Sequence, residues 1–225
     1  MQRGLAILVG SLMACVGLLG QGLAEPAGIS REGGALVPPE EYPVFDTIVE
    51  SKFLTSQTRI VVIERATVRR LHPEVDALPT VDWFDAARPF DGRLPADLVT
   101  DFVVKNQRPA RLEHRFRFGV SVRFVTPEGL PEPEVRLAPR LKPGSPRLVQ
   151  RDPQGPPRTL DRLAFSRAGF NLREDQALVY VANERPAGDG AGFLMWLQRQ
   201  GGAWTFIDTD VLWTARPVEE ERSRR

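Results

Sequence analysis

The stretch AFSRAGFNLREDQALVYV, residues 164–181, combines a serine with several hydrogen-bonding side chains. A nucleophilic serine needs a base within hydrogen-bond reach, and in many hydrolases it sits in a Gly-x-Ser-x-Gly elbow. Ala164 and Ala168 occupy the positions two residues before and two residues after Ser166, so this elbow is absent. We therefore expect no catalytic serine here and assign no residue a catalytic role.

The same stretch has two other interpretations. If it lies at an open end of a sheet, Arg167, Asn171 and Tyr180 would bind a small polar or anionic ligand through a guanidinium, an amide and a phenol. The structural alternative is a bend between two strands, because NLRED has turn character and Gly169 permits a bulge. Polar side chains would then satisfy backbone groups at the bend. We favour the bend and keep Arg167, Asn171 and Tyr180 as the candidate ligand-binding residues.

Acidic side chains gather around Trp83, where Asp82, Asp85 and Asp91 lie close in sequence. A glycosidase needs two carboxyl groups at a defined separation across a sugar cleft, which sequence spacing does not establish. A calcium loop would need alternating ligands and a glycine, and this pattern is absent. His114 alternates with apolar residues and is expected on the core side of a strand. These four residues carry the alternative hypothesis, a hydrolase of envelope polymers.

Cofactor motifs are not found. GDGAG, residues 188–192, precedes the strand-like FLMWLQ and no Lys-Ser/Thr pair follows, so it predicts a hairpin turn and not a phosphate loop. The chain has one cysteine, Cys15, so thiolate metal sites and internal disulfides are unavailable. We predict neither a cofactor nor a bound metal.

The chain begins with a short basic start, an apolar run and small residues, which is the layout of a secretory signal peptide over residues 1–24. We favour cleavage after Ala24 and a periplasmic or extracellular location, without stable membrane insertion after cleavage. LMAC, residues 12–15, resembles a bacterial lipobox, so lipidation of Cys15 is the alternative. An apolar stretch follows the cysteine, where lipoproteins usually begin a polar tether, and this favours cleavage.

The charges are balanced, with 30 Lys and Arg against 29 Asp and Glu. Loss of Arg3 with the signal peptide would make the two numbers equal. Because no excess of positive charge attracts a polyanion, we predict no nucleic-acid partner.

The remaining pattern predicts one α+β domain over residues 41–216, after a flexible leader over 25–40 and before a disordered tail over 217–225. Apolar spacing predicts helices over 42–53 and 96–106 and a helical turn or two over 81–87. β-Branched and alternating runs predict strands over 58–68, 112–124, 160–167, 176–184, 192–199 and 203–214. A Pro-rich loop spans 126–157. The expected fold is a set of N-terminal helices packed on a curled, mostly antiparallel β-sheet of five or six strands.

The run SRAGFN, then QALVYV, then a glycine-rich turn, a strand, GGAW and a final tryptophan resembles the C-terminal part of a family of uncharacterised secreted bacterial proteins. The resemblance implies export but no activity. The order of helices and sheet also resembles the cone of nuclear-transport-factor-like and cystatin-like domains, and a shared fold does not define a function. We therefore expect an exported, non-catalytic module that binds a ligand or a protein in the envelope or outside the cell, and the sequence does not specify its ligand, partner or oligomeric state.

Overall fold

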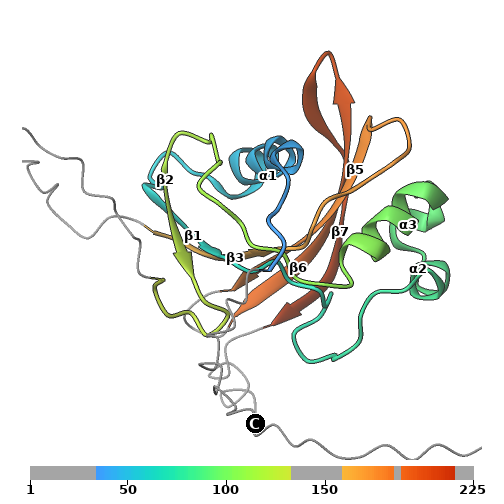
Figure 1. Ribbon diagram of the computed structural model, residues 1–225, viewed down its shortest axis with the longest axis horizontal. Helices are drawn as coiled ribbons and strands as arrows, with labels where there is room; N and C mark the ends of the chain where they lie inside the picture. The colour runs from blue at the N-terminus through green and yellow to red at the C-terminus, as the bar shows by residue number, and fades with distance from the viewer. Residues whose placement is uncertain (1–33, 133–158, 185–188, 216–225) are drawn as a thin grey trace, which may run out of the picture. The chain divides into compact units, whose positions relative to one another are not determined.

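The computed structural model describes residues 34–132, 159–184 and 189–215, which belong to one compact unit that begins at Gly34 (Figure 1). The predicted signal peptide (1–24), Cys15 and the predicted tail (217–225) lie outside the described residues. So do most of the leader (25–40) and most of the Pro-rich loop (126–157). Within the described part of the chain, no helix is long and apolar enough to cross a membrane.

The helical elements form where the sequence supplies start signals. Thr80 caps α2 by accepting a hydrogen bond from the Trp83 N–H at 3.1 Å. Pro95 precedes α3 and Pro43 lies in the first turn of α1, where a helix does not need a backbone donor. The elements are η1 (Pro39–Glu41), α1 (Tyr42–Ile48), the π-helical turn η2 (Val49–Phe53), α2 (Val81–Ala87), η3 (Pro89–Gly92) and α3 (Ala96–Lys105). The predicted helices over 42–53 and 96–106 and the helical turns over 81–87 are confirmed.

Seven strands form one mixed sheet with the order β2-β1-β3-β5-β6-β7, and the short β4 also pairs with β5. Gly201 and Gly202 have positive φ angles in the hairpin turn between β6 and β7, as their sequence predicts. The strands are β1 (Ile60–Glu64), β2 (Ser121–Val125), β3 (Thr159–Phe165), β4 (Gly169–Phe170), β5 (Gln176–Glu184), β6 (Gly190–Gln200) and β7 (Ala203–Ala215).

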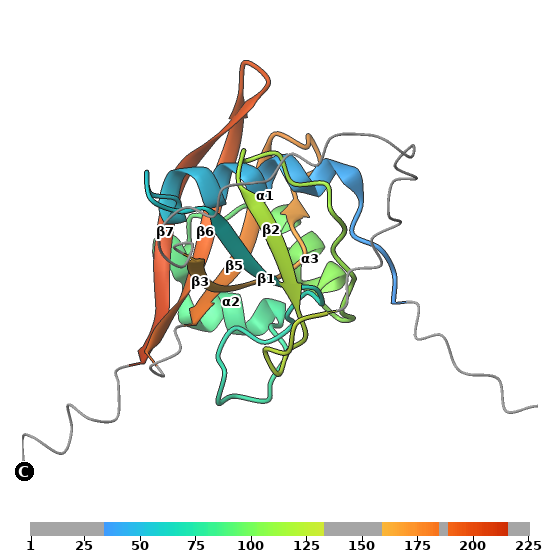
Figure 2. The same ribbon diagram turned by 90° about the vertical axis from the view of Figure 1, so that its left-hand side faces the viewer.

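Both faces of the sheet are covered, and alternate residues of its strands contribute to two separate cores. Figure 2 shows α1 lying across the near face, with α2 and α3 on the far side. In β5, for example, Val179 and Val181 pack in the core beneath α1, whereas Leu178 and Tyr180 pack in the core beneath α3. The two-residue period of a strand produces this division. Because β5 lies between two cores, its central residues are buried on both faces and do not alternate between apolar and polar.

Three features of the predicted fold are wrong. The sheet is mixed and not mostly antiparallel, because β1 pairs in parallel with both β2 and β3. A parallel pair needs a long crossover, and residues 65–120 provide one between β1 and β2. This crossover contains α2 and α3, so only α1 precedes the first strand and the helices are not an N-terminal group. The sheet also has seven strands and not five or six, because the bend after β3 pairs as β4.

The predicted long strand over 112–124 is also wrong, since only its end, β2, pairs in the sheet. Residues 112–118 find other partners for their backbone. The Glu113 N–H donates to the Tyr42 hydroxyl at 2.7 Å, and the Arg117 N–H donates to Asp46 Oδ1 at 2.9 Å. Gly119, with a φ of 73°, separates this segment from β2. The apolar alternation therefore reflects packing against α1 as well as sheet pairing.

Gly169 is the point of closest approach between β4 and α3. A Cβ atom at this position would lie 2.6 Å from Phe102 Cα. We expect Gly169→Ala to lower the free energy of unfolding by about 3 kcal/mol or more, because helix and strand must separate. Urea denaturation measures this. Gly34→Ala is the control, since its added Cβ lies no closer than 3.9 Å to another atom. Equal stability of both variants would contradict the close approach.

Candidate functional site

Arg167 is committed to a buried ion pair with Glu41, which is only 1% exposed. Its Nε donates to both carboxylate oxygens, at 2.9 and 3.1 Å, and its Nη2 donates to Glu41 Oε1 at 2.5 Å. The Ala168 N–H also donates to Glu41 Oε2 at 2.9 Å. The pair therefore joins the start of α1 to the bend that follows β3.

The other polar side chains of this stretch also bind backbone groups. Ser166 Oγ accepts from the Tyr180 N–H and donates to the Arg167 carbonyl, each at 2.9 Å. Asn171 Oδ1 accepts from the N–H groups of Asp175 and Gln176, both at 3.0 Å. These contacts are those expected of a structural bend.

The three candidate ligand-binding residues are not all part of the pocket described below. Tyr180 lines the pocket described below, whereas Arg167 and Asn171 do not. The role assigned to Arg167 and Asn171 in ligand binding stays a prediction, and their side chains already have partners within the protein.

The pocket described below is lined by none of the residues proposed for a hydrolase, and their role stays a prediction. Asp82 and Asp85 are exposed on α2, and Asp91 is exposed in η3. His114 is also exposed, so its predicted place on the core side of a strand is wrong; its ring packs against Phe124 with centroids 4.6 Å apart.

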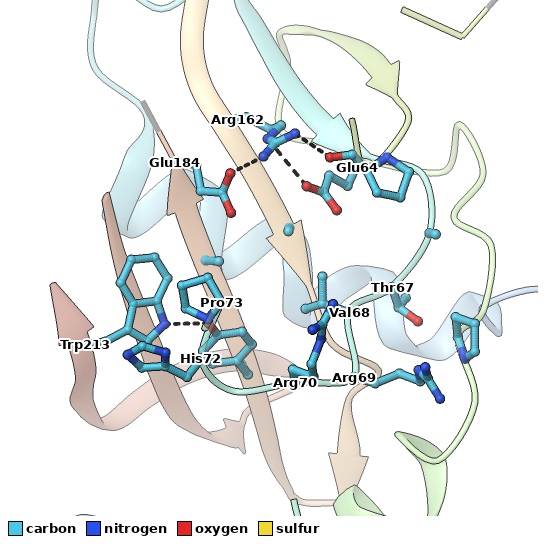
Figure 3. Close-up of a pocket in the computed structure, with 16 residues that line it drawn as sticks. Glu64, Thr67, Val68, Arg69, Arg70, His72, Pro73, Arg162, Glu184 and Trp213 are labelled. Atoms are coloured by element: carbon cyan, nitrogen blue, oxygen red, sulfur yellow. Dashed lines mark hydrogen bonds and ion pairs between the residues drawn. The ribbon is translucent and has the colours of Figure 1, made fainter. Parts of the chain in front are cut away.

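A different part of the sheet forms an open pocket of about 440 Å³ (Figure 3). Strands β1, β3, β5 and β7 supply its floor, and the segment 66–73 supplies a wall. Ala164 and Ala182 leave the floor hollow, because neighbouring strands present only methyl groups there. A pocket of this size suits a small organic molecule.

Three charged residues lie in a row at one end of this pocket. Glu64 ends β1, Arg162 lies in β3, and Glu184 ends β5 directly opposite Arg162. The guanidinium donates from Nη2 to Glu184 and from Nη1 to the Pro127 carbonyl, the latter at 2.7 Å. Its Nε lies 3.4 Å from Glu64 Oε1. Arg162 thus bridges two carboxylates that would otherwise repel each other.

Glu64 is the most unusual member of this row. It is 5% exposed, and among the described residues its carboxylate has one partner, the distant Nε of Arg162. Burial raises the pKa of Glu64 to about 7; the charge of Arg162 lowers it, and Glu184 and Glu128 raise it further. The protein therefore holds a carboxyl group in the pocket that exchanges a proton near neutral pH.

Trp213 and Tyr180 form an aromatic wall next to this row. The Trp213 Nε1–H donates to the Tyr180 hydroxyl at 2.7 Å. Gly192, on the neighbouring strand, makes room for the indole, because any Cβ there would overlap the Trp213 ring. Burial raises the pKa of Tyr180 to about 12, so the phenol remains protonated. The His72 ring packs edge-on against Trp213, with centroids 5.8 Å apart.

Sequence reasoning missed most of this pocket. Glu64 and Arg162 are charged residues within the apolar strand patterns IVVIE and LDRLAF, and this interruption was the available signal. Which strands lie side by side was not visible, because β1 and β3 are distant in sequence and pair in parallel. In the described part of the chain, no group of three or more His, Cys, Asp or Glu side chains could hold a metal ion.

Comparisons with protein-family models, with curated proteins and with solved structures find no match to this chain.

We expect the Glu41–Arg167 pair to be required for stability. Arg167→Met leaves Glu41 buried without its cation and should cost about 3–5 kcal/mol of unfolding free energy. The double variant Glu41→Gln, Arg167→Met should recover part of this loss, because no unpaired charge remains. Chemical denaturation measures both. Arg173→Met is the matched control, since that side chain is 78% exposed in the next turn. Normal stability of Arg167→Met together with lost ligand binding would instead favour a binding role.

Glu64 should make stability depend on pH. Its pKa is about 7 in the folded protein against 4.5 in the unfolded chain, so the folded state binds the proton more tightly. The resulting stabilisation is complete below pH 4.5 and is lost as the pH rises through 7. We expect the free energy of unfolding of the wild type to fall, relative to that of Glu64→Gln, between these values. Asp46, whose pKa burial raises to about 6, is present in both proteins and cancels in the difference. Parallel pH profiles would contradict the raised pKa of Glu64.

Proposed function

We propose that this protein is an exported, non-catalytic binding module whose ligand enters the pocket lined by Glu64, Arg162, Glu184, Tyr180 and Trp213. The observation that carries the proposal is the state of Glu64. The carboxyl group of Glu64 opens onto the pocket although the residue is only 5% exposed, and its one partner among the described residues lies 3.4 Å away, so it keeps acceptor capacity for a ligand. A ligand donor that reaches this end of the pocket would hydrogen-bond the Glu64 carboxyl group.

Two further features support binding. The floor between β3 and β5 is hollow at Ala164 and Ala182, where larger side chains would fill the core. Beside it, the Tyr180 hydroxyl accepts a hydrogen bond from Trp213, which leaves its own O–H to donate to a ligand. An apolar hollow with a few fixed polar groups is the usual form of a small-molecule site. Export is supported by the signal-like N-terminal sequence.

One observation favours an enzyme as the second candidate. The raised pKa of Glu64, about 7, is the range in which a carboxyl group acts as a general acid or base. Glu184 is the second carboxylate of the pocket, and both are bound to the same guanidinium. The hydrolase hypothesis based on Asp82, Asp85, Asp91 and His114 concerns other residues and stays a prediction. Turnover of a bound compound that stops in Glu64→Gln would favour it over binding alone.

The proposal predicts a ligand whose binding depends on the pocket. We expect compounds found in a thermal-shift screen of amino acids, sugars, amines and small organic acids to raise the melting temperature of the wild type. Ala66→Trp adds a large ring to the pocket wall and should reduce the affinity of these compounds at least tenfold in calorimetry. Ala86→Trp is the control, because Ala86 is exposed on α2 and does not line this pocket. Compounds that bind both variants equally would place the site elsewhere and overturn the proposal.

A further inference from the structure

The charges of the pocket are separated along its length. Figure 3 shows the Glu64, Arg162 and Glu184 row at one end and Arg69 and Arg70 at the other. Such an arrangement favours a ligand whose own charges are separated in the same way.

The end of the pocket formed by Glu64, Arg162 and Glu184 favours a cation. All three nitrogens of Arg162 are already directed at partners: Nη1 at the Pro127 carbonyl, Nη2 at Glu184 and Nε at Glu64. Two carboxylates thus face the single positive charge of the guanidinium, so this end of the pocket has no excess positive charge to attract an anionic ligand. With both carboxylates ionised, the row carries one net negative charge, and among the described residues Glu64 has only its distant contact with Arg162. An ammonium or guanidinium group would neutralise the row and hydrogen-bond Glu64.

The other end, near Arg69 and Arg70, favours an anion. Arg69 is exposed and donates to the Gln107 carbonyl at 3.4 Å; among the described residues it pairs with no carboxylate. Arg70 pairs with Asp76 at 3.2 Å, but both side chains are at least half exposed, so water screens this contact strongly. A carboxylate of the ligand would meet at least one guanidinium here.

Apolar atoms separate the two ends. Val68 lies on the wall, Ala164 and Ala182 on the floor, and the Trp213 ring at the side. A short hydrocarbon chain suits these surfaces, because it loses no hydrogen bonds on leaving water.

From this separation of charge we infer that the ligand is a small zwitterion, with an ammonium or guanidinium group at Glu64, a carboxylate at Arg69 and a short apolar chain between them. This inference rests on the proposed function, since it concerns the same pocket. It adds the class of compound that the pocket selects.

The test uses straight-chain ω-amino acids of three to eight carbons and isothermal titration calorimetry. The best member is then compared with the amine and the carboxylic acid of the same chain length. We expect the zwitterion to bind at least tenfold more tightly than either. Glu64→Gln should lower the affinity for the amino acid and for the amine at least tenfold and leave the affinity for the acid unchanged. Arg69→Gln should lower the affinity for the amino acid and for the acid and leave the affinity for the amine unchanged.

Proton release gives an independent readout. A bound cation forces Glu64 into its ionised form, so calorimetry at pH 6 in buffers of different ionisation enthalpy should detect protons released on binding of the amino acid. Glu64→Gln should abolish this release. Glu184→Gln, at a half-buried and more tolerant position, should also weaken the amine and serves as a second variant if Glu64→Gln folds poorly.

The outcomes separate this inference from the proposed function. If the acid binds most tightly, or no ω-amino acid binds, the zwitterion class is wrong. If compounds from the broader screen still lose affinity in Ala66→Trp, the pocket remains the proposed binding site. If Ala66→Trp leaves the affinity of those compounds unchanged, the proposed function fails as well.

Discussion

The buried pair between Glu41 and Arg167 is the contact on which much of the architecture depends. It joins the first helix to the bend between β3 and β4, two segments distant in the chain. Asn106 adds a second link at the same bend, since its side chain accepts from the Arg167 N–H at 2.8 Å and donates to the Arg167 carbonyl at 3.2 Å. Thus α1 on one face of the sheet and α3 on the other are both anchored to one residue. A buried pair of this kind is more a determinant of geometry than a source of net stability.

The bend in turn determines the position of the pocket. Ser166 binds the Tyr180 backbone, so β3 and β5 are kept together just beyond Ala164. From that point the even-numbered residues of both strands face the same side of the sheet. Arg162 and Glu184 therefore meet at one end, and Tyr180 meets Trp213 nearby. The residues that shape the bend and those that line the proposed binding pocket are thus neighbours in the same stretch.

Much of the local structure could be predicted from the sequence. Strand β5 begins and ends at the expected residues, and the hairpin at Gly201 and Gly202 follows from their tolerance of positive φ. These features depend on neighbours in the chain. The parallel pairing of β1 with β3 depends on a long crossover and has no local signal, so the sheet was expected to be mostly antiparallel. The pocket was missed for the same reason, because Glu64 and Arg162 meet only through that pairing. His114 shows the reverse case, since its alternation with apolar residues resembles a strand although its segment packs on α1.

The fit of Gly192 against Trp213 has a consequence for altering the pocket. The indole occupies the space that a side chain at position 192 would need, so the two positions share one volume. A larger residue at 192 is compatible with the fold only if residue 213 becomes smaller. Exchanging volume between these two positions would change the width of the aromatic wall while leaving Glu64, Arg162 and Glu184 in place. Substitutions at these two positions would therefore change the size of the proposed binding pocket without changing its charges. Either evolution or design could use them to alter the length and bulk of the ligand.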